Sequence, residues 1–93
     1  MMIIENEALW QFEDLYDWYS AIDIRLSKKF ATEFYKVLDE IANNPTHHFY
    51  IAPNLRRCVF KTFQCAVVYN FNGNIIKVAL VVDLRSQPKT NFY

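Results

Sequence analysis

The dipeptide Asn72-Gly73 constrains the fold more than any other feature of the sequence, because it separates two runs of apolar and β-branched residues, 65–69 and 75–83. Both residues tolerate the positive φ that a type I′ turn requires, so the dipeptide predicts a tight hairpin between the two runs. A third apolar run, 55–60, precedes them after a short break. We therefore expect three consecutive antiparallel strands.

The first half of the chain shows the spacing of two amphipathic helices. Apolar residues recur three and four positions apart over 8–22 and again over 26–41. We expect Asn6 to cap the first helix and Asp23 to cap the second. The run 43–45, Asn-Asn-Pro, predicts the end of the second helix, because asparagine accepts the left-handed conformation and proline cannot continue the hydrogen-bond ladder.

These elements predict an α+β fold in two layers, with the order (β)ααβββ. A short first strand at 2–5 precedes the helices, and a loop at 46–54 leads into the strands. The short connection between the helices indicates a helical hairpin. Helices that are grouped before strands favour packing of this hairpin on one face of an antiparallel sheet. We expect residues 1–93 to form a single domain whose other sheet face meets solvent or a partner.

Charge is balanced overall but unevenly distributed along the chain. Residues 1–52 carry nine Asp and Glu against four Lys and Arg, whereas residues 53–93 carry one Asp against six Lys and Arg. This asymmetry indicates a cationic surface on the strand half, suited to nucleic acid or to an acidic protein segment. The alternative is that the two halves neutralise each other within the fold.

Composition indicates a packed protein, since 53% of the residues are hydrophobic and sixteen (two Trp, six Tyr, eight Phe) are aromatic. Residues 1–4 lack a basic n-region, and no apolar run approaches the roughly 20 residues of a membrane span, so we expect a cytoplasmic protein without membrane contact.

Cofactor and metal sites are not indicated by the sequence. The one glycine, Gly73, leaves no glycine-rich phosphate loop. Cys58 and Cys65 are too few for a disulfide framework, and too few for a zinc site without histidine support, so we expect two buried apolar side chains. His47 and His48 are expected to be exposed loop residues.

An ordered set of residues along nearly the whole chain resembles the RelE/ParE superfamily of bacterial toxins, and its ParE-like branch most closely. The set comprises Asp17-Trp18-Tyr19, Leu26, Phe30, Ile41, Asn44-Pro45, Arg56-Arg57, Phe63, Tyr69, Arg85 and Pro88. The sequence departs from the family at the turn, which is usually Phe-Pro-Tyr and here is Phe63-Gln64-Cys65. Asp83 also stands at about the place where the last strand often ends in a histidine.

The resemblance implies the toxin of a type II toxin–antitoxin pair, of the kind found in plasmid stabilisation systems, with a cognate antitoxin as partner. ParE-like members inhibit DNA gyrase, and RelE-like members cleave mRNA in the ribosome. The neutral net charge and the lack of histidine in the strand half favour the gyrase-binding, non-enzymatic alternative. A metal-independent endoribonuclease and a module that only binds a partner stay open, as does a homodimer.

Candidate site residues follow from these alternatives. Arginine contacts phosphate oxygens through two hydrogen bonds, so Arg57, Lys61 and Arg85 are the catalytic candidates for an endoribonuclease, with Tyr93 as a weak acid. Arg56 is expected to point to the opposite side of its strand from Arg57. For binding to the antitoxin or the target we expect basic residues and one surplus tryptophan: Arg56, Arg57, Lys61, Lys77, Arg85 and Trp18.

Overall fold

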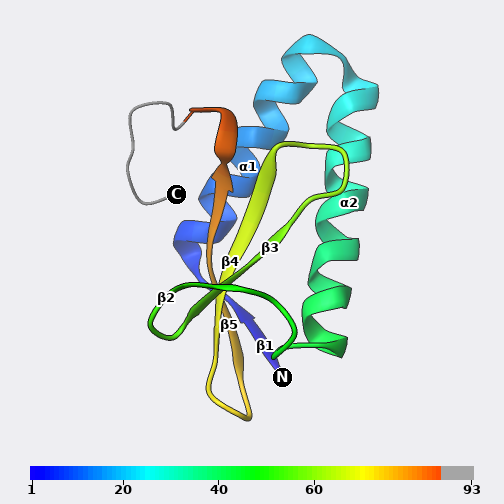
Figure 1. The fold of residues 1–93 in the computed structure, drawn as a ribbon. Coiled ribbons are helices and arrows are strands. Elements are labelled where there is room, and N and C mark those ends of the chain that lie inside the picture. The colour runs from blue at the N-terminus through cyan, green and yellow to red at the C-terminus, as the bar shows by residue number, and fades with distance from the viewer. Residues whose placement is uncertain (87–93) are drawn as a thin grey trace.

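The computed structural model describes residues 1–86, and Pro88, Lys89 and Tyr93 lie outside this part of the chain. One strand comes first along the chain, two helices follow it, and four further strands come after the helices. Their bounds are β1 Met2–Ile4, α1 Asn6–Ile22, α2 Ile24–Asn43, β2 Tyr50–Ala52, β3 Leu55–Val59, β4 Cys65–Phe71 and β5 Ile76–Asp83, followed by a 3₁₀ turn, η1, Leu84–Ser86. The two helices lie side by side as the predicted hairpin, and together they cover one face of the sheet (Figure 1).

The sheet has the strand order β1-β5-β4-β3-β2. Strands β3, β4 and β5 pair antiparallel in sequence, as predicted. The sheet as a whole is mixed, however, because β1 pairs parallel to β5. Two backbone hydrogen bonds lie at the two ends of β1: Ile76 N–H donates to the Met1 carbonyl (3.0 Å), and Glu5 N–H donates to the Val78 carbonyl (2.9 Å). The short strand β2 occupies part of the predicted loop 46–54, because its backbone pairs with the edge of β3.

The hairpin between β4 and β5 forms where Asn72-Gly73 predicts it, but not as a type I′ turn. Gly73 has a φ of +100°, and within residues 1–86 the only other residue with positive φ is Asn54. The side-chain oxygen of Asn72 instead accepts hydrogen bonds from the N–H groups of Asn74 and Ile75, both at 2.9 Å. This Asx arrangement supplies the turn's hydrogen bonds without a left-handed Asn72.

The helix ends agree with most of the expected caps. The Asp23 carboxylate accepts a hydrogen bond from Arg25 N–H (2.9 Å), so the predicted cap of α2 is confirmed. For α1 the cap position is Glu5 rather than Asn6, and no side chain completes it. The second helix ends at Asn43 before the proline, but Asn44 has a φ of −141° and is not left-handed.

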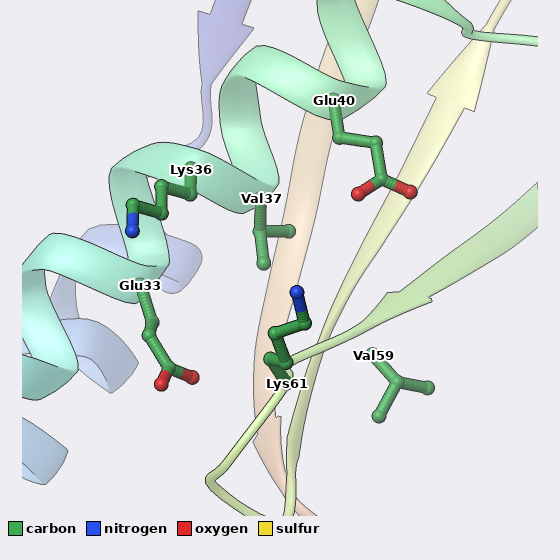
Figure 2. A pocket seen from close by; sticks show the side chains of 6 residues that line it. All are labelled: Glu33, Lys36, Val37, Glu40, Val59 and Lys61. Carbon is green, nitrogen blue, oxygen red and sulfur yellow. The ribbon is translucent and has the colours of Figure 1, made fainter.

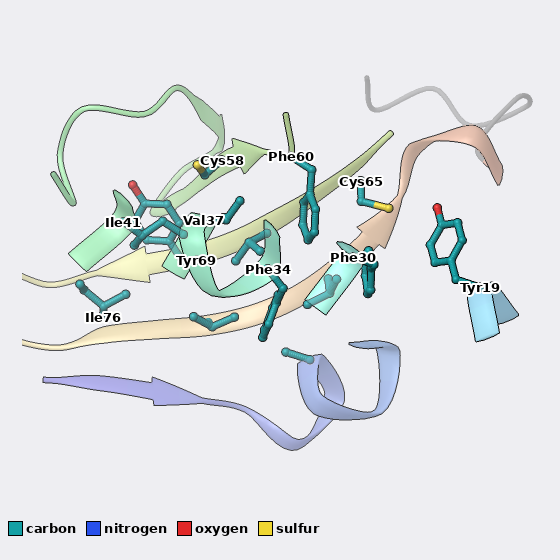
Figure 3. Packing of buried hydrophobic residues seen from close by; sticks show 14 residues of the cluster. Tyr19, Phe30, Phe34, Val37, Ile41, Cys58, Phe60, Cys65, Tyr69 and Ile76 are labelled. Atoms are coloured by element: carbon teal, nitrogen blue, oxygen red, sulfur yellow. The ribbon is translucent and has the colours of Figure 1, made fainter. Parts of the chain in front are cut away.

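The core lies between the helix pair and the sheet, and is rich in stacked rings (Figure 3). Phe30 of α2 is fully buried at its centre. Its ring is stacked on that of Phe60 and tilted against that of Tyr19, with a centroid separation of 5.2 Å in both pairs. Both cysteines, Cys58 and Cys65, are buried and free, as expected. Within residues 1–86, neither helix has the length and apolar character needed to cross a membrane.

The face of the sheet that is turned away from the helices is also largely apolar. Strand alternation places Arg57 and Val59 of β3 on this face, beside Val68 of β4, because their neighbours Cys58 and Val67 belong to the core. Val59 remains 47% exposed. We call this side of the sheet the open face; on it Arg57 lies beside aliphatic side chains, of which Val68 is only 2% exposed.

Candidate functional site

The predicted basic residues do not share one surface of the described structure. Arg57 lies on the open face, whereas Arg56 pairs with the core residue Tyr69 and points to the helix side, as strand alternation predicts. Lys77 of β5 lies on the same face as Arg57, because its neighbours Ile76 and Val78 belong to the core, but Arg85 follows the far end of that strand, roughly 20 Å of strand away. The expectation of a shared cationic face is therefore corrected.

The Arg56 side chain forms hydrogen bonds within the fold. Its guanidinium donates hydrogen bonds to the carbonyl oxygens of Thr46 (3.0 Å) and His48 (2.8 Å) and to the hydroxyl of Tyr50 (2.7 Å). It also lies over the Tyr50 ring, 3.9 Å from the centroid. These contacts hold the loop between α2 and β2 against β3.

Arg85 and Trp18 are brought together by the structure, from opposite ends of the chain. Arg85 donates two side-chain hydrogen bonds to the carboxylate of Asp83, both at 3.1 Å, and this contact raises the pKa of the guanidinium above its usual value. The guanidinium carbon lies 4.7 Å from the ring centroid of Trp18 and 5.5 Å from that of Tyr19. We call Trp18, Tyr19, Asp83 and Arg85 the Arg85 corner. Trp18 is 49% exposed, so this corner presents a braced aromatic and cationic surface to solvent.

The titratable groups beneath the Arg85 corner are neutral at physiological pH. Burial raises the pKa of the Tyr19 hydroxyl to about 12 and that of the Cys65 thiol to about 11. Neither group is therefore a base or a thiolate nucleophile at neutral pH.

Lys61 borders a pocket of about 370 Å³ between α2 and the end of β3, where Val59 also lines it. Figure 2 shows Lys61 extending toward α2, whose Glu33, Lys36 and Glu40 also line the pocket. Two lysines and two glutamates give this lining no net charge. The Glu33 carboxylate is already engaged by the backbone N–H (3.0 Å) and the hydroxyl of Thr62. The pocket is therefore a poor phosphate site.

The three catalytic candidates for RNA cleavage occupy different parts of the described structure. Arg57 lies on the open face, Lys61 borders the α2 pocket, and Arg85 belongs to the corner on the helix side. Stabilisation of a pentacoordinate phosphate needs donors that converge on one position. Within residues 1–86, these side chains do not form such an arrangement.

The two adjacent histidines differ in environment, which corrects the expectation that both are exposed. His47 is exposed, but the side chain of His48 is only 10% exposed. Burial lowers the pKa of the His48 imidazole below its usual value, against the opposing effect of the Glu40 carboxylate. No periodicity around His48 predicts this burial, because it depends on the approach of β3 to the end of α2.

Comparison with known proteins yields a structural relative. No protein-family model matches the chain, and no curated protein matches its sequence. The fold is similar to a solved chain described as "Chromosomal ParDE TA system from P. aeruginosa", with a TM-score of 0.68 and 10% sequence identity. The match covers 89% of this chain and 94% of that chain. At this identity the likeness establishes the fold, and the predicted α+β two-layer architecture is confirmed.

Proposed function

We propose that this protein is the toxin of a type II toxin–antitoxin pair, that it resembles ParE, and that a cognate antitoxin neutralises it. The observation that carries the proposal is the structural match, which covers nearly all of both chains and whose title names a ParDE toxin–antitoxin system. The residue set that resembles the RelE/ParE superfamily supports the same function independently of this structural match. Both kinds of target, gyrase and the ribosome, place the protein's action in the cytoplasm.

Gyrase binding is the favoured mode of action. An RNA-binding toxin depends on excess positive charge for its affinity, and this chain has a net charge of zero. The endoribonuclease candidates Arg57, Lys61 and Arg85 also lie apart within the described residues. Binding to a protein target requires no converging donors, so it is compatible with this arrangement.

The Arg85 corner is the proposed centre of contact with the target or the antitoxin. Arginine and tryptophan dominate the binding energy of many interfaces, and a side chain that is already held in place loses less entropy on binding. Arg85 is braced by Asp83, and Trp18 packs against it while remaining half-exposed. Arg57, Lys61 and Lys77 are proposed as peripheral contacts, whereas Arg56 contributes by holding the β2 loop.

The purified protein tests this mode of action in a gyrase supercoiling assay. We expect inhibition at micromolar protein, and a loss of at least about tenfold in potency for Trp18→Ala, the typical effect of removing an interface anchor. Arg25→Ala is the matched control for Arg85→Ala, because Arg25 forms the same two-point ion pair with Asp23 but is fully exposed at the α1–α2 connection. Supercoiling that proceeds unchanged at micromolar excess would contradict gyrase binding.

The endoribonuclease alternative makes a different prediction. Primer extension on translated mRNA would show new cleavage ends after induction, and these ends would disappear in Arg57→Ala or Arg85→Ala. Growth without arrest and without cleavage, despite accumulation of the folded protein, would instead favour a module that only binds a partner.

A further inference from the structure

His48 presents a buried nitrogen that has no hydrogen-bond partner. Its side chain is nine-tenths buried, and Nε2 is inaccessible and unpaired. A carboxylate oxygen of Glu40 lies 3.6 Å from Nε2, which is too long for a hydrogen bond. A buried polar nitrogen without a partner is costly, so this atom indicates a missing ligand.

Two further ligand-type side chains surround this nitrogen. One ligand atom each from Glu40, His48 and Cys58 lies within 4.8 Å of the other two. The three residues come from the last turns of α2, the loop before β2, and β3. No other element contributes a carboxylate, imidazole or thiol to this group among the described residues.

The surrounding contacts hold His48 in place. The carbonyl of His48 accepts a hydrogen bond from Arg56 (2.8 Å), and the His48 ring stands edge-on to Tyr69 at 6.1 Å. The Tyr69 hydroxyl in turn donates to the carbonyl of Pro45 (2.8 Å), which fixes the end of α2 against β4. His48 is therefore positioned before any ligand arrives, which favours tight metal binding.

We propose that Glu40, His48 and Cys58 bind a zinc ion, through a carboxylate oxygen, Nε2 and Sγ respectively. In a tetrahedral zinc site with bonds of about 2.0 to 2.3 Å, neighbouring ligand atoms lie about 3.4 Å apart, close to the observed 3.6 Å between His48 and Glu40. The sulfur and nitrogen ligands select zinc over magnesium or calcium. Three protein ligands leave the fourth position for water or an external ligand.

Charge and protonation are consistent with this assignment. Burial lowers the pKa of His48 against the opposing effect of the Glu40 carboxylate, and the neighbouring His47 and Arg56 act in the same direction as burial, so the neutral imidazole offers a lone pair. Binding breaks the S–H bond of Cys58, forms a zinc–sulfur bond and releases one proton to solvent. The carboxylate and the thiolate then balance the two positive charges of the ion. Zinc affinity should consequently fall as pH is lowered.

Metal titration of the untagged, chelator-treated protein tests the site. In competition with a chromogenic chelator we expect one zinc ion per chain. Cobalt(II) should produce the near-ultraviolet absorption band of a thiolate–cobalt bond. Loss of a direct ligand should weaken binding by at least about tenfold, the lower end of what loss of an outer-shell partner costs.

Each ligand has a matched control in the chain. His48→Ala, Cys58→Ser and Glu40→Gln should lose zinc affinity, whereas His47→Ala, Cys65→Ser and Asp39→Asn should retain it. Glu40 is exposed, so Glu40→Gln should keep the fold. This variant therefore tests zinc binding even where substitution of the buried Cys58 unfolds the protein. Equal affinities across the two sets, or cobalt binding without a thiolate band, would overturn the site. This outcome is independent of the proposed toxin function.

Discussion

The carboxylate of Glu33 on α2 accepts hydrogen bonds from both the backbone N–H and the side-chain hydroxyl of Thr62, in the turn between β3 and β4. These two bonds join residues 29 positions apart and tie α2 to that turn. Since Glu33 is buried, its carboxylate oxygens depend on these donors in place of water.

Thr62→Val should therefore destabilise the protein while keeping the shape of the side chain. The substitution removes one charge-assisted hydrogen bond in a partly buried position, and we expect the free energy of unfolding to fall by about 1 to 2 kcal/mol. Urea denaturation followed by circular dichroism measures this change. Thr32→Val, at an exposed position of α2, is the control and should shift the free energy of unfolding by less than about 0.5 kcal/mol. Equal effects at the two positions would contradict the role of Glu33.

Gln11 provides a second tie, between α1 and the sheet. Its side-chain oxygen accepts a hydrogen bond from the backbone N–H of Val81 at 2.7 Å, and Val81 is only 2% exposed. Gln11→Ala should leave this buried donor unsatisfied and lower the free energy of unfolding by about 1 to 3 kcal/mol. Glu13→Ala, on the exposed side of the same helix, should have little effect in the same urea titration. A stable Gln11→Ala variant would show that water replaces the side chain.

Alkaline pH should destabilise the folded state of the metal-free protein. Burial raises the pKa of the thiols of Cys58 and Cys65 from 9.0 to about 11, and that of the hydroxyls of Tyr19 and Tyr69 from 10.0 to about 12. The folded state therefore keeps protons that the unfolded state releases, so the free energy of unfolding falls as pH rises between about 9 and 12. Below pH 9 these groups contribute no pH dependence.

Urea midpoints measured from pH 7.5 to 10.5 test this behaviour. The midpoint should be steady with respect to these four groups up to pH 9 and then decline, and Tyr69→Phe should make the decline above pH 10 shallower. A midpoint that rises above pH 9 would contradict the burial of these groups.

Much of the fold follows from local sequence patterns. The two helices, the Asp23 cap, the break at Pro45 and the three antiparallel strands are each determined by spacing or by a residue with strong local preferences. Strand β1 shows the limit of this reasoning. Three residues can be recognised as extended, but their parallel pairing with β5 depends on where α1 packs, which no local pattern encodes.

The candidate sites were harder to predict for the same reason. Charge counting placed six basic residues in the strand half, yet Arg56 is used to hold a loop, and Arg85 pairs with an aspartate two residues away. The proximity of Arg85 to Trp18 joins residues 67 positions apart. The group of Glu40, His48 and Cys58 likewise forms only when β3 lies against α2. Rules based on local spacing cannot predict either group, because its residues are far apart in the sequence.

Viable counts after induced expression in a bacterial host test the central proposal, that this chain is a toxin, most directly. We expect colony-forming units to fall or stop rising after induction of the wild-type chain, with relaxation of a reporter plasmid. The Trp18→Ala, Arg85→Ala double variant should restore growth at an equal level of folded protein. If cells that express the wild-type chain divide at the rate of the empty-vector control, with as much folded protein as cells that express the double variant, the proposed toxin function would be contradicted.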